Sequence, residues 1–104
     1  TPAFDIPSSS AKLHAAYPNP FNPMTRIPYQ TALEGESQMV KLDILDIRGR
    51  VVRTIVDSSH PAGFEGEAIW DGNNSAGERV PSGTYMYRLQ VGKYNQSRLM
   101  TLVK

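Results

Sequence analysis

Cysteine is absent from this sequence of 104 residues, and no apolar stretch approaches the length of a membrane-spanning helix. Without cysteine, the chain has no disulfide framework, no thiolate zinc site and no cysteine nucleophile. Without a run of about 18 apolar residues, no direct insertion into a membrane is predicted. The chain does not begin with methionine, so we expect a fragment or a processed product of a larger protein.

An excess of one charge is also missing. The chain has 11 lysines and arginines against 10 aspartates and glutamates, a formal net charge of +1. The densest basic stretch consists of three arginines flanked by three aspartates: Arg48, Arg50, Arg53, Asp43, Asp46 and Asp57. Nucleic acids and anionic membranes are usually bound by a concentrated basic face. We therefore predict no nucleic-acid partner.

Side chains that could perform chemistry are few. The two histidines, His14 and His60, have no second histidine and no cysteine at metal-ligand spacing, and we interpret both as ordinary surface residues. The carboxylates Asp43 and Asp46 are close in sequence but have no evident pocket, and the loop at 63–66 lacks the lysine of a phosphate-binding loop. We predict no catalytic residues, no cofactor and no enzymatic activity.

One loop is rich in oxygen-bearing side chains. Residues 71–77 read Asp-Gly-Asn-Asn-Ser-Ala-Gly, but they lack the glycine and glutamate positions of an EF-hand loop. Turns formed by Asp and Asn side chains explain this composition without a metal. No metal ligand is predicted, and calcium binding by the 71–77 loop stays an open alternative at this point.

Short alternating segments separated by turn residues run through most of the chain. Residues 1–12 are rich in proline and serine and are predicted to be a linker, followed by one domain over residues 13–104. Strands are predicted over residues 25–30, 39–47, 51–56, 67–70, 84–91 and 96–103. Turn signals roughly every 8–12 residues, with no helical period, predict an all-β sandwich or barrel of about seven strands.

Alternation with a period of two predicts which side chains form the core. The residues expected to point inward are Val40, Leu42, Ile44, Ala68, Trp70, Tyr85, Tyr87, Leu89 and Val91. Asp43 is expected on the opposite face. Pro28 lacks a backbone donor, which predicts an edge strand or a bulge for residues 25–30. Gly49 is predicted to supply the positive φ of a hairpin turn.

Three prolines stiffen one short segment between Tyr17 and residue 23. Its members are Pro18, Asn19, Pro20, Phe21, Asn22 and Pro23. Each proline fixes φ, removes a donor and extends the residue before it. The segment therefore cannot be a helix or a central strand. We expect a stiff crossing piece from which Tyr17 and Phe21 plug the edge of a core.

The order of the motifs resembles a known family. The motifs lie at residues 17–23, 45–52, 61–63, 70–72, 80–89 and 100–104. Together they resemble the C-terminal sorting domains of type IX (Por) secretion, and the middle and later motifs equally resemble the immunoglobulin-like domain of the flagellar hook-capping protein. This resemblance implies an immunoglobulin-like antiparallel β-sandwich of about seven strands, in which Gly49, Trp70, Asp71 and Gly72 belong to the structural motifs.

The resemblance also implies a non-catalytic sorting or attachment role in an exported bacterial protein. The domain would follow N-terminal catalytic or adhesive domains of the same chain, pass through the periplasm and be read by an outer-membrane translocon. A sortase-like peptidase would then cleave within residues 1–12, and the cargo would be secreted or held on the cell surface. The recognised part would be mainly the final hairpin, residues 83–104.

The sorting signal implied by the resemblance comprises twelve residues. They are Pro81, Ser82, Gly83, Tyr85, Tyr87, Arg88, Leu89, Gly92, Arg98, Met100, Leu102 and Lys104. Family members commonly carry a lysine where this chain has Leu99, and Arg98 places its positive charge on the opposite strand face.

Two alternatives stay open from the sequence. A structural or assembly module of immunoglobulin-like fold, such as a hook-cap-type domain or a spacer, would self-associate or dock to a multimeric partner. A carbohydrate-binding accessory domain would expose Tyr85 and Tyr87, together with Tyr94, as a stacking platform for sugars.

Overall fold

The computed structural model describes residues 11–103, which form seven β-strands. The strands are β1 (Lys12–Leu13), β2 (Thr25–Gln30), β3 (Gln38–Leu45), β4 (Val51–His60), β5 (Glu65–Trp70), β6 (Gly83–Val91) and β7 (Tyr94–Leu102). Ala11 is buried and Lys12 begins β1, so these two residues of the predicted linker are part of the folded structure. The remaining linker residues, 1–10, and Lys104 lie outside the described residues.

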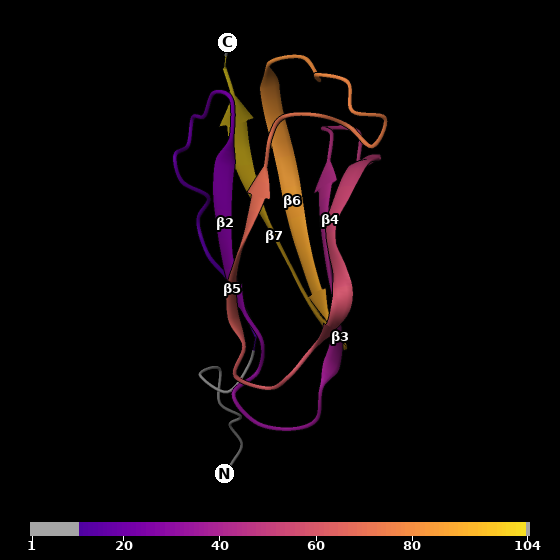
Figure 1. Cartoon of the computed structure of the whole chain (residues 1–104). Coiled ribbons are helices and arrows are strands. Elements are labelled where there is room, and N and C mark those ends of the chain that lie inside the picture. The colour runs from indigo at the N-terminus through magenta and orange to yellow at the C-terminus, as the bar shows by residue number, and fades with distance from the viewer. Residues whose placement is uncertain (1–10, 104) are drawn as a thin grey trace.

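The strands form two sheets that pack face to face (Figure 1). One sheet has three strands in the order β1-β2-β5, and the other has four in the order β4-β3-β6-β7. Every neighbouring pair is antiparallel. The predicted all-β immunoglobulin-like sandwich of about seven strands is confirmed. The strand order leaves β4 and β7 as the two edges of the larger sheet.

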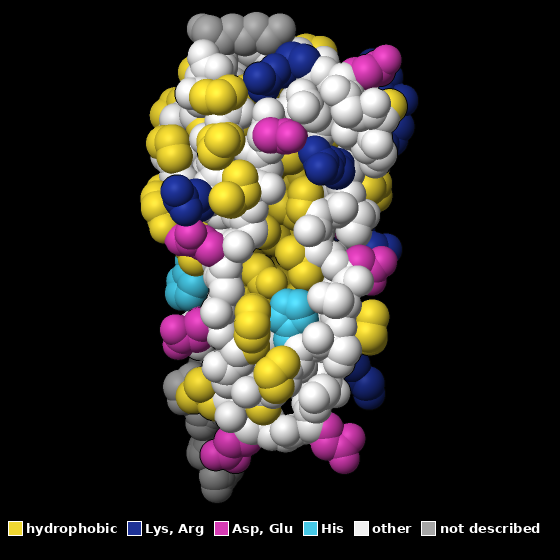
Figure 2. All heavy atoms as spheres, viewed as in Figure 1, with side chains coloured by type: hydrophobic (Ala, Val, Ile, Leu, Met, Phe, Trp, Pro, Cys, Tyr) yellow, Lys and Arg dark blue, Asp and Glu magenta, His cyan; other side chains and the backbone are white. Residues whose placement is uncertain are grey.

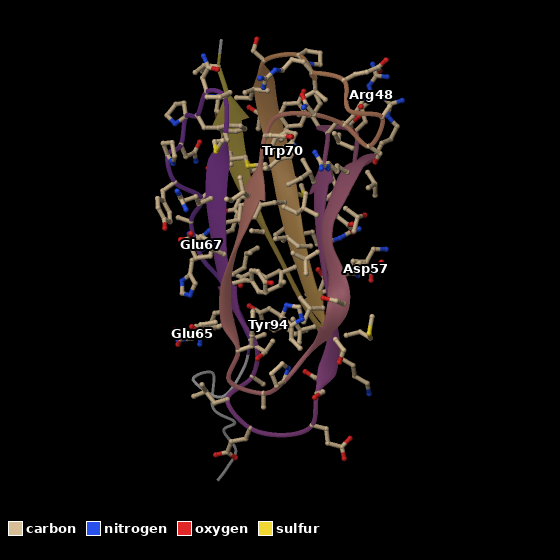
Figure 3. All side chains as sticks on the ribbon, viewed as in Figure 1. Arg48, Asp57, Glu65, Glu67, Trp70 and Tyr94 are labelled. Atoms are coloured by element: carbon tan, nitrogen blue, oxygen red, sulfur yellow. The ribbon has the colours of Figure 1, made fainter. Side chains whose placement is uncertain are left out.

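Alternation along the strands buries one face of each sheet, as predicted. The core includes Val40, Leu42, Ile44, Ala68, Trp70, Tyr85, Tyr87, Leu89 and Val91. Trp70 is fully buried, and Figure 3 shows it pointing from β5 into the space between the sheets. The Trp70 ring lies 5.5 Å from the Phe21 ring and 5.3 Å, edge-on, from the Tyr85 ring, measured between centroids. Such tilted aromatic pairs add about 1 kcal/mol beyond their buried area.

Pro28 lies in the middle strand of its sheet, which corrects the prediction of an edge strand or a bulge. β1 pairs only with Tyr29 and Gln30, so Pro28 lies just beyond it. There the His14 N–H donates to the Pro28 carbonyl at 3.0 Å. Pro28 has no N–H that could donate to the His14 carbonyl. The Tyr87 hydroxyl, from the opposite sheet, donates to the His14 carbonyl at 2.9 Å instead. A side chain thus replaces the donor that proline lacks.

β4 continues to His60, beyond the predicted end at Val56, while the other predicted strands agree within two residues at each end. The extension buries His60, so the prediction of a surface residue is wrong for His60 and confirmed for the exposed His14. The His60 Nε2 lies 2.9 Å from the Tyr29 hydroxyl. The His60 ring also packs edge-on against Phe64, with centroids 4.4 Å apart.

Asp43 points away from the core, as predicted, but it is fully buried rather than exposed. The Thr54 hydroxyl donates to its carboxylate at 2.6 Å, and the Arg88 guanidinium donates to it at 3.2 Å. A buried carboxylate needs such partners, because an unpaired charge away from water is strongly destabilising. Neighbouring strands therefore bury this charge on the outer face of the larger sheet.

Candidate functional site: the C-terminal hairpin

The last two strands, β6 and β7, form a regular hairpin at one side of the four-stranded sheet. Their register runs without a shift from the pair Gly83–Leu102 to the turn. The chain reverses at Gly92, whose φ of 57° lies in the left-handed region. This backbone conformation favours glycine, whereas the nearest atom to an added Cβ, the Gln38 side-chain nitrogen at 2.6 Å, is the end of a flexible side chain that can move.

Many residues of the predicted sorting signal have structural roles. Five of them are buried in the core: Tyr85, Tyr87, Leu89, Met100 and Leu102. Five are exposed: Pro81, Ser82, Gly83, Gly92 and Arg98. Arg88 is half-buried and pairs with Asp43, and Lys104 lies outside the described residues. A partner that binds the folded domain could therefore contact chiefly the exposed members.

The two hairpin tyrosines use their hydroxyls inside the fold. The Tyr87 hydroxyl accepts from the Ala16 N–H at 2.8 Å and donates to the His14 carbonyl at 2.9 Å. The Tyr85 hydroxyl donates to the Pro81 carbonyl at 2.6 Å. Burial raises the pKa of Tyr85 and of Tyr87. Both hydroxyls therefore remain protonated donors that tie the hairpin to other segments.

The carbohydrate alternative requires Tyr85 and Tyr87 on the surface. Both side chains are buried, so the predicted stacking platform is wrong. Tyr94, its third member, is partly buried and packs against the core at the other end of the sandwich from Trp70 (Figure 3). Alternation placed these rings on one face as predicted, but that face is the inner face of the sheet.

The proline-rich segment holds the end of β7. The Phe21 N–H donates to the Thr101 carbonyl at 2.9 Å, and the Val103 N–H donates to the Phe21 carbonyl at 3.0 Å. The Asn19 side-chain oxygen accepts from the Thr101 N–H at 2.9 Å. Phe21 is buried against Trp70, as predicted for a residue that plugs the core. The segment therefore caps the outer edge of β7 over its last residues.

Tyr17, which was expected to plug the core beside Phe21, is half-exposed instead. Its hydroxyl donates to the Glu67 carboxylate, which also pairs with Arg26 at 3.1 Å. The hydrogen bond to Glu67 raises the pKa of Tyr17, and the donors Tyr17 and Arg26 lower the pKa of Glu67. Figure 2 shows exposed apolar side chains gathered at the upper left of this view, where the segment before β2 lies.

Sequence reasoning missed most of the residues on the outer edge of β7. The backbone N–H and carbonyl of Thr101 face away from β6, toward the proline-rich segment. Because this direction alternates along a strand, Asn95, Ser97 and Leu99 face the same way. Within residues 11–103, none of their outward backbone groups has a hydrogen-bond partner. The alternation of β7 was the available signal, but only the strand order makes this side an edge.

A row of apolar side chains crosses the outer face of the larger sheet. Leu99 lies opposite Met86, Met86 lies opposite Leu45, and Leu45 lies opposite Val51. At the two ends of this row, Leu99 is 60% exposed and Val51 is 54% exposed. A shallow cavity of about 190 Å³ at the β7 end is lined by Met86, Ser97, Arg98 and Leu99. The apolar row therefore extends to the open edge.

The motif of Trp70, Asp71 and Gly72 shapes the turn after β5. The Asp71 carboxylate accepts from the Arg53 guanidinium at 2.9 Å and from the Asn73 N–H at 3.0 Å, and the Trp70 ring N–H donates to the Asn73 carbonyl at 2.9 Å. Gly72 has a φ of 81°. Within residues 11–103, no three His, Cys, Asp or Glu side chains gather as metal ligands. Asx-turn chemistry accounts for this loop.

Asp46 and Gly49 shape the turn between β3 and β4. Asp46 accepts from the backbone N–H groups of Arg50 at 3.0 Å and Arg48 at 2.9 Å, and it pairs with the Arg50 guanidinium at 3.1 Å. These donors, the Arg50 N–H foremost, lower the pKa of Asp46. Gly49 has the predicted positive φ, 84°. The carboxylate therefore organises a turn.

The family profile of the FlgD Ig-like domain matches residues 19–96, more than half of the chain. No curated protein sequence matches the chain. Within residues 11–103, no helix is long and apolar enough to span a membrane. The family match confirms the resemblance to the hook-capping immunoglobulin-like domain.

Three solved structures contain a similar fold. Dimeric latent PorU from Porphyromonas gingivalis has a TM-score of 0.72 and 23% identity over 89% of this chain and 9% of PorU. PorZ, an essential bacterial surface component of the type-IX secretion system of Porphyromonas gingivalis, has a TM-score of 0.57 and 20% identity over 86% of this chain and 11% of PorZ. The Pseudomonas fluorescens alkylpurine DNA glycosylase AlkC, bound to DNA containing an abasic site analog, has a TM-score of 0.53 and 12% identity over 92% of this chain and 31% of AlkC. The chain thus spans only a small part of each, and these likenesses show the fold alone.

Proposed function

Because the chain belongs to the FlgD Ig-like domain family, we propose that it is a non-catalytic module at the C-terminal end of an exported bacterial protein. Its hairpin would be the address that carries the protein through the periplasm and the outer membrane to the cell surface or the medium. The observation that carries this proposal is the position of β7. It forms a sheet edge, and within residues 11–103 its outward backbone groups from Asn95 to Leu99 are unpaired.

An open strand edge suits recognition by other proteins, because main-chain hydrogen bonds can capture it without a deep pocket. The fold shared with part of PorZ, itself a surface component of the type-IX secretion system, supports a role in such a pathway. The proposed partners are an outer-membrane translocon that reads the hairpin and a sortase-like peptidase that cleaves within residues 1–12. Catalytic or adhesive domains of the same parent chain would precede the module.

The surroundings of the polar side chains support a role without catalysis. His60 binds Tyr29 inside the fold, and Asp43 is enclosed by Thr54 and Arg88. These groups serve the packing of the sandwich, and a catalytic group must instead reach a substrate. We therefore assign the module to transport and attachment, with no cofactor.

A secretion assay in a type IX-competent host tests the proposal. A fluorescent cargo fused to residues 1–104 is compared with the same fusion carrying Arg98→Glu and Leu99→Ser, both on exposed side chains. The matched control is Ile69→Ser, on an exposed side chain of the other sheet. The natural and control fusions are expected at the surface or in the medium, and the edge variant in the periplasm. Delivery of the edge variant at the natural level would contradict the proposal.

A fusion lacking residues 83–104 provides the reference level for retention. This deletion removes β6, an inner strand of the larger sheet, and therefore also disrupts the fold. Circular dichroism of the purified point variants establishes that they remain folded. Only the point variants separate loss of the address from loss of the structure.

The second candidate function is a structural or assembly module. The exposed apolar side chains at the two ends of the row, Leu99 and Val51, favour it, because exposed apolar surface commonly marks contact surfaces. This candidate predicts association of the isolated chain. Light scattering that shows a concentration-dependent oligomer, together with normal secretion of the edge variant, would favour assembly over sorting.

A further inference from the structure

β7 lacks the features that usually protect an edge strand from pairing. Natural edges are commonly blunted by proline, by bulges or by several charges. β7 has no proline and no register shift against β6, and Arg98 is its one charged residue. Figure 1 shows β7 at the back of the view, partly behind β5 and β6. The strand is therefore a suitable template for an added strand.

The free part of this edge has defined limits. Beyond Leu99, the outward groups of Thr101 are bound by the proline-rich segment. Toward the turn, the first outward residue is Asn95. On the inner face, the Gln96 and Arg98 side chains reach the Leu13 backbone in β1, each at 3.4 Å. An added strand can therefore pair over about five residues, 95–99, beside the seam between the two sheets.

The charges of the hairpin are all positive. Residues 83–104 contain Arg88, Lys93, Arg98 and Lys104 and no aspartate or glutamate. Arg88 is matched by Asp43, whereas Arg98 has no carboxylate within 4.0 Å among residues 11–103. A second copy of the chain would bring two positive hairpins together at this edge. Charge complementarity instead favours an acidic partner.

An added strand would place its side chains alternately on the two faces of the sheet. On the outer face, a side chain beside Leu99 would lengthen the apolar row that crosses the sheet through Met86. On the inner face, the next side chain would lie near the exposed guanidinium of Arg98. The edge therefore fits a strand with aliphatic residues on one face and acidic residues on the other.

We propose that residues 95–99 of β7 bind an extended segment of another protein in which aliphatic and acidic residues alternate. The inference rests on the proposed function, because this segment would belong to the machinery that reads the hairpin. Backbone hydrogen bonds to Asn95, Ser97 and Leu99 hold the segment. The aliphatic contact with Leu99 and the ionic contact with Arg98 select it.

Two blocked nine-residue peptides test the inference on the chain of residues 1–104. One alternates leucine with glutamate, and the other alternates leucine with lysine. In an NMR titration, the glutamate peptide is expected to shift the amide signals of Asn95, Ser97 and Leu99 and to bind at least tenfold more tightly than the lysine peptide. Equal binding of both peptides, no binding of the glutamate peptide at millimolar concentration, or shifts centred on β4 or β5 would overturn the inference.

Two variants examine the backbone and the charge separately. Ser97→Pro removes an outward N–H that makes no bond to β6, and it should weaken binding of the glutamate peptide at least tenfold. Its matched control, Ser97→Ala, keeps the N–H and should change the affinity less than twofold. Arg98→Glu should reverse the preference in favour of the lysine peptide, and it tests the site even where Ser97→Pro fails to fold. Unchanged preference in Arg98→Glu would overturn the inference.

Two further outcomes separate this inference from other readings. Concentration-dependent shifts at residues 95–99 without any peptide would identify a second copy as the occupant and overturn it. Failure of the peptides to bind, with cargo delivery still dependent on the hairpin edge, would overturn this inference alone. Peptide binding that is lost in Ser97→Pro, with cargo delivery unaffected by the edge variant, would support the inference and overturn the proposed function.

Discussion

β4 and β7 are opposite edges of one sheet, yet their outer sides differ. β4 pairs with β3 through two register shifts, and the loop after β5 covers part of its outer side. In that cover, the Ser75 N–H donates to the Val52 carbonyl at 3.1 Å, and Arg53 pairs with Asp71 at 2.9 Å. Figure 3 shows Asp57 pointing outward from the same strand. β7 pairs with β6 without a shift, and among the described residues its outer side is covered only at its last residues.

The difference shows that protection of an edge is a local property. Bulges and charges on β4 discourage pairing with another chain, which is the usual way in which sheet proteins avoid aggregation. Among residues 11–103, β7 is capped by the proline-rich segment at Thr101, and the outward backbone groups of Asn95, Ser97 and Leu99 are unpaired. Substitutions in the cap, at the Tyr87 hydroxyl that joins the two sheets beside β7, and at Asp46 in the turn before β4 should therefore change the stability of the domain by different amounts.

Removal of the ring that anchors the cap should have the largest effect. Phe21→Ala deletes a fully buried side chain packed on Trp70 and should lower the free energy of unfolding by about 3–5 kcal/mol. Urea unfolding followed by tryptophan fluorescence measures it. The exposed Asn22→Ala is the control and should change stability by less than about 0.5 kcal/mol. A loss below 1 kcal/mol in Phe21→Ala would show that the cap contributes little to the fold.

Loss of the Tyr87 hydroxyl, which joins the two sheets beside β7, should have the next largest effect on stability. Tyr87→Phe removes a hydroxyl that serves both the Ala16 N–H and the His14 carbonyl, leaving two backbone groups unpaired. The expected loss of unfolding free energy is about 1–3 kcal/mol. Tyr17→Phe, at a half-exposed ring, should change stability much less. Equal effects of the two variants in urea unfolding would contradict the assigned role of the Tyr87 hydroxyl.

The side-chain bond in the cap should have a smaller effect. Asn19→Ala removes the acceptor of the Thr101 N–H and should lower the free energy of unfolding by about 1 kcal/mol. Hydrogen exchange at the Thr101 amide should accelerate toward the rate of the uncapped Ser97 amide. Asn22→Ala again serves as the control. A Thr101 amide that stays protected in Asn19→Ala would mean that the cap does not depend on this bond.

Substitution of Asp46, in the turn between β3 and β4, should have the smallest effect on stability, and it should appear as a change in the pH dependence of unfolding. The Arg50 and Arg48 donors hold the pKa of Asp46 below its usual range. Because the folded pKa is the lower one, Asp46 contributes stability above its unfolded pKa of about 4 and loses it as pH falls through the folded value. Asp46→Asn should therefore lose less stability than the natural chain between pH 7 and pH 3.

Urea midpoints at these two pH values measure the difference, with the exposed Asn22→Ala, which removes no titratable group, as the control. The control should follow the pH dependence of the natural chain. If Asp46→Asn and the natural chain lose the same stability between the two values, the turn does not depend on an ionised Asp46.

Much of the fold could be predicted because its causes are local. Alternating side chains marked the strands at 25–30 and 84–91, and Gly49 marked a turn that needs a positive φ. The single tryptophan was expected in the core because alternation places it on the same face as Ala68, and it is fully buried. The burial of Tyr85 and Tyr87, which rules out the sugar platform, required knowledge of which face the second sheet covers.

The sequence by itself determined the class of fold, the core faces of the strands and the order of motifs that places the chain in its family, because these depend on periodicity and turn chemistry along the chain. Only the tertiary structure decided that Pro28 sits in a middle strand, that His60 is buried and that Asn95, Ser97 and Leu99 form an open edge. These features depend on residues far apart in sequence. The Tyr87 hydroxyl supplies the donor beside Pro28, and strand order, which no local pattern encodes, places β7 at the edge of the sheet formed by residues 11–103.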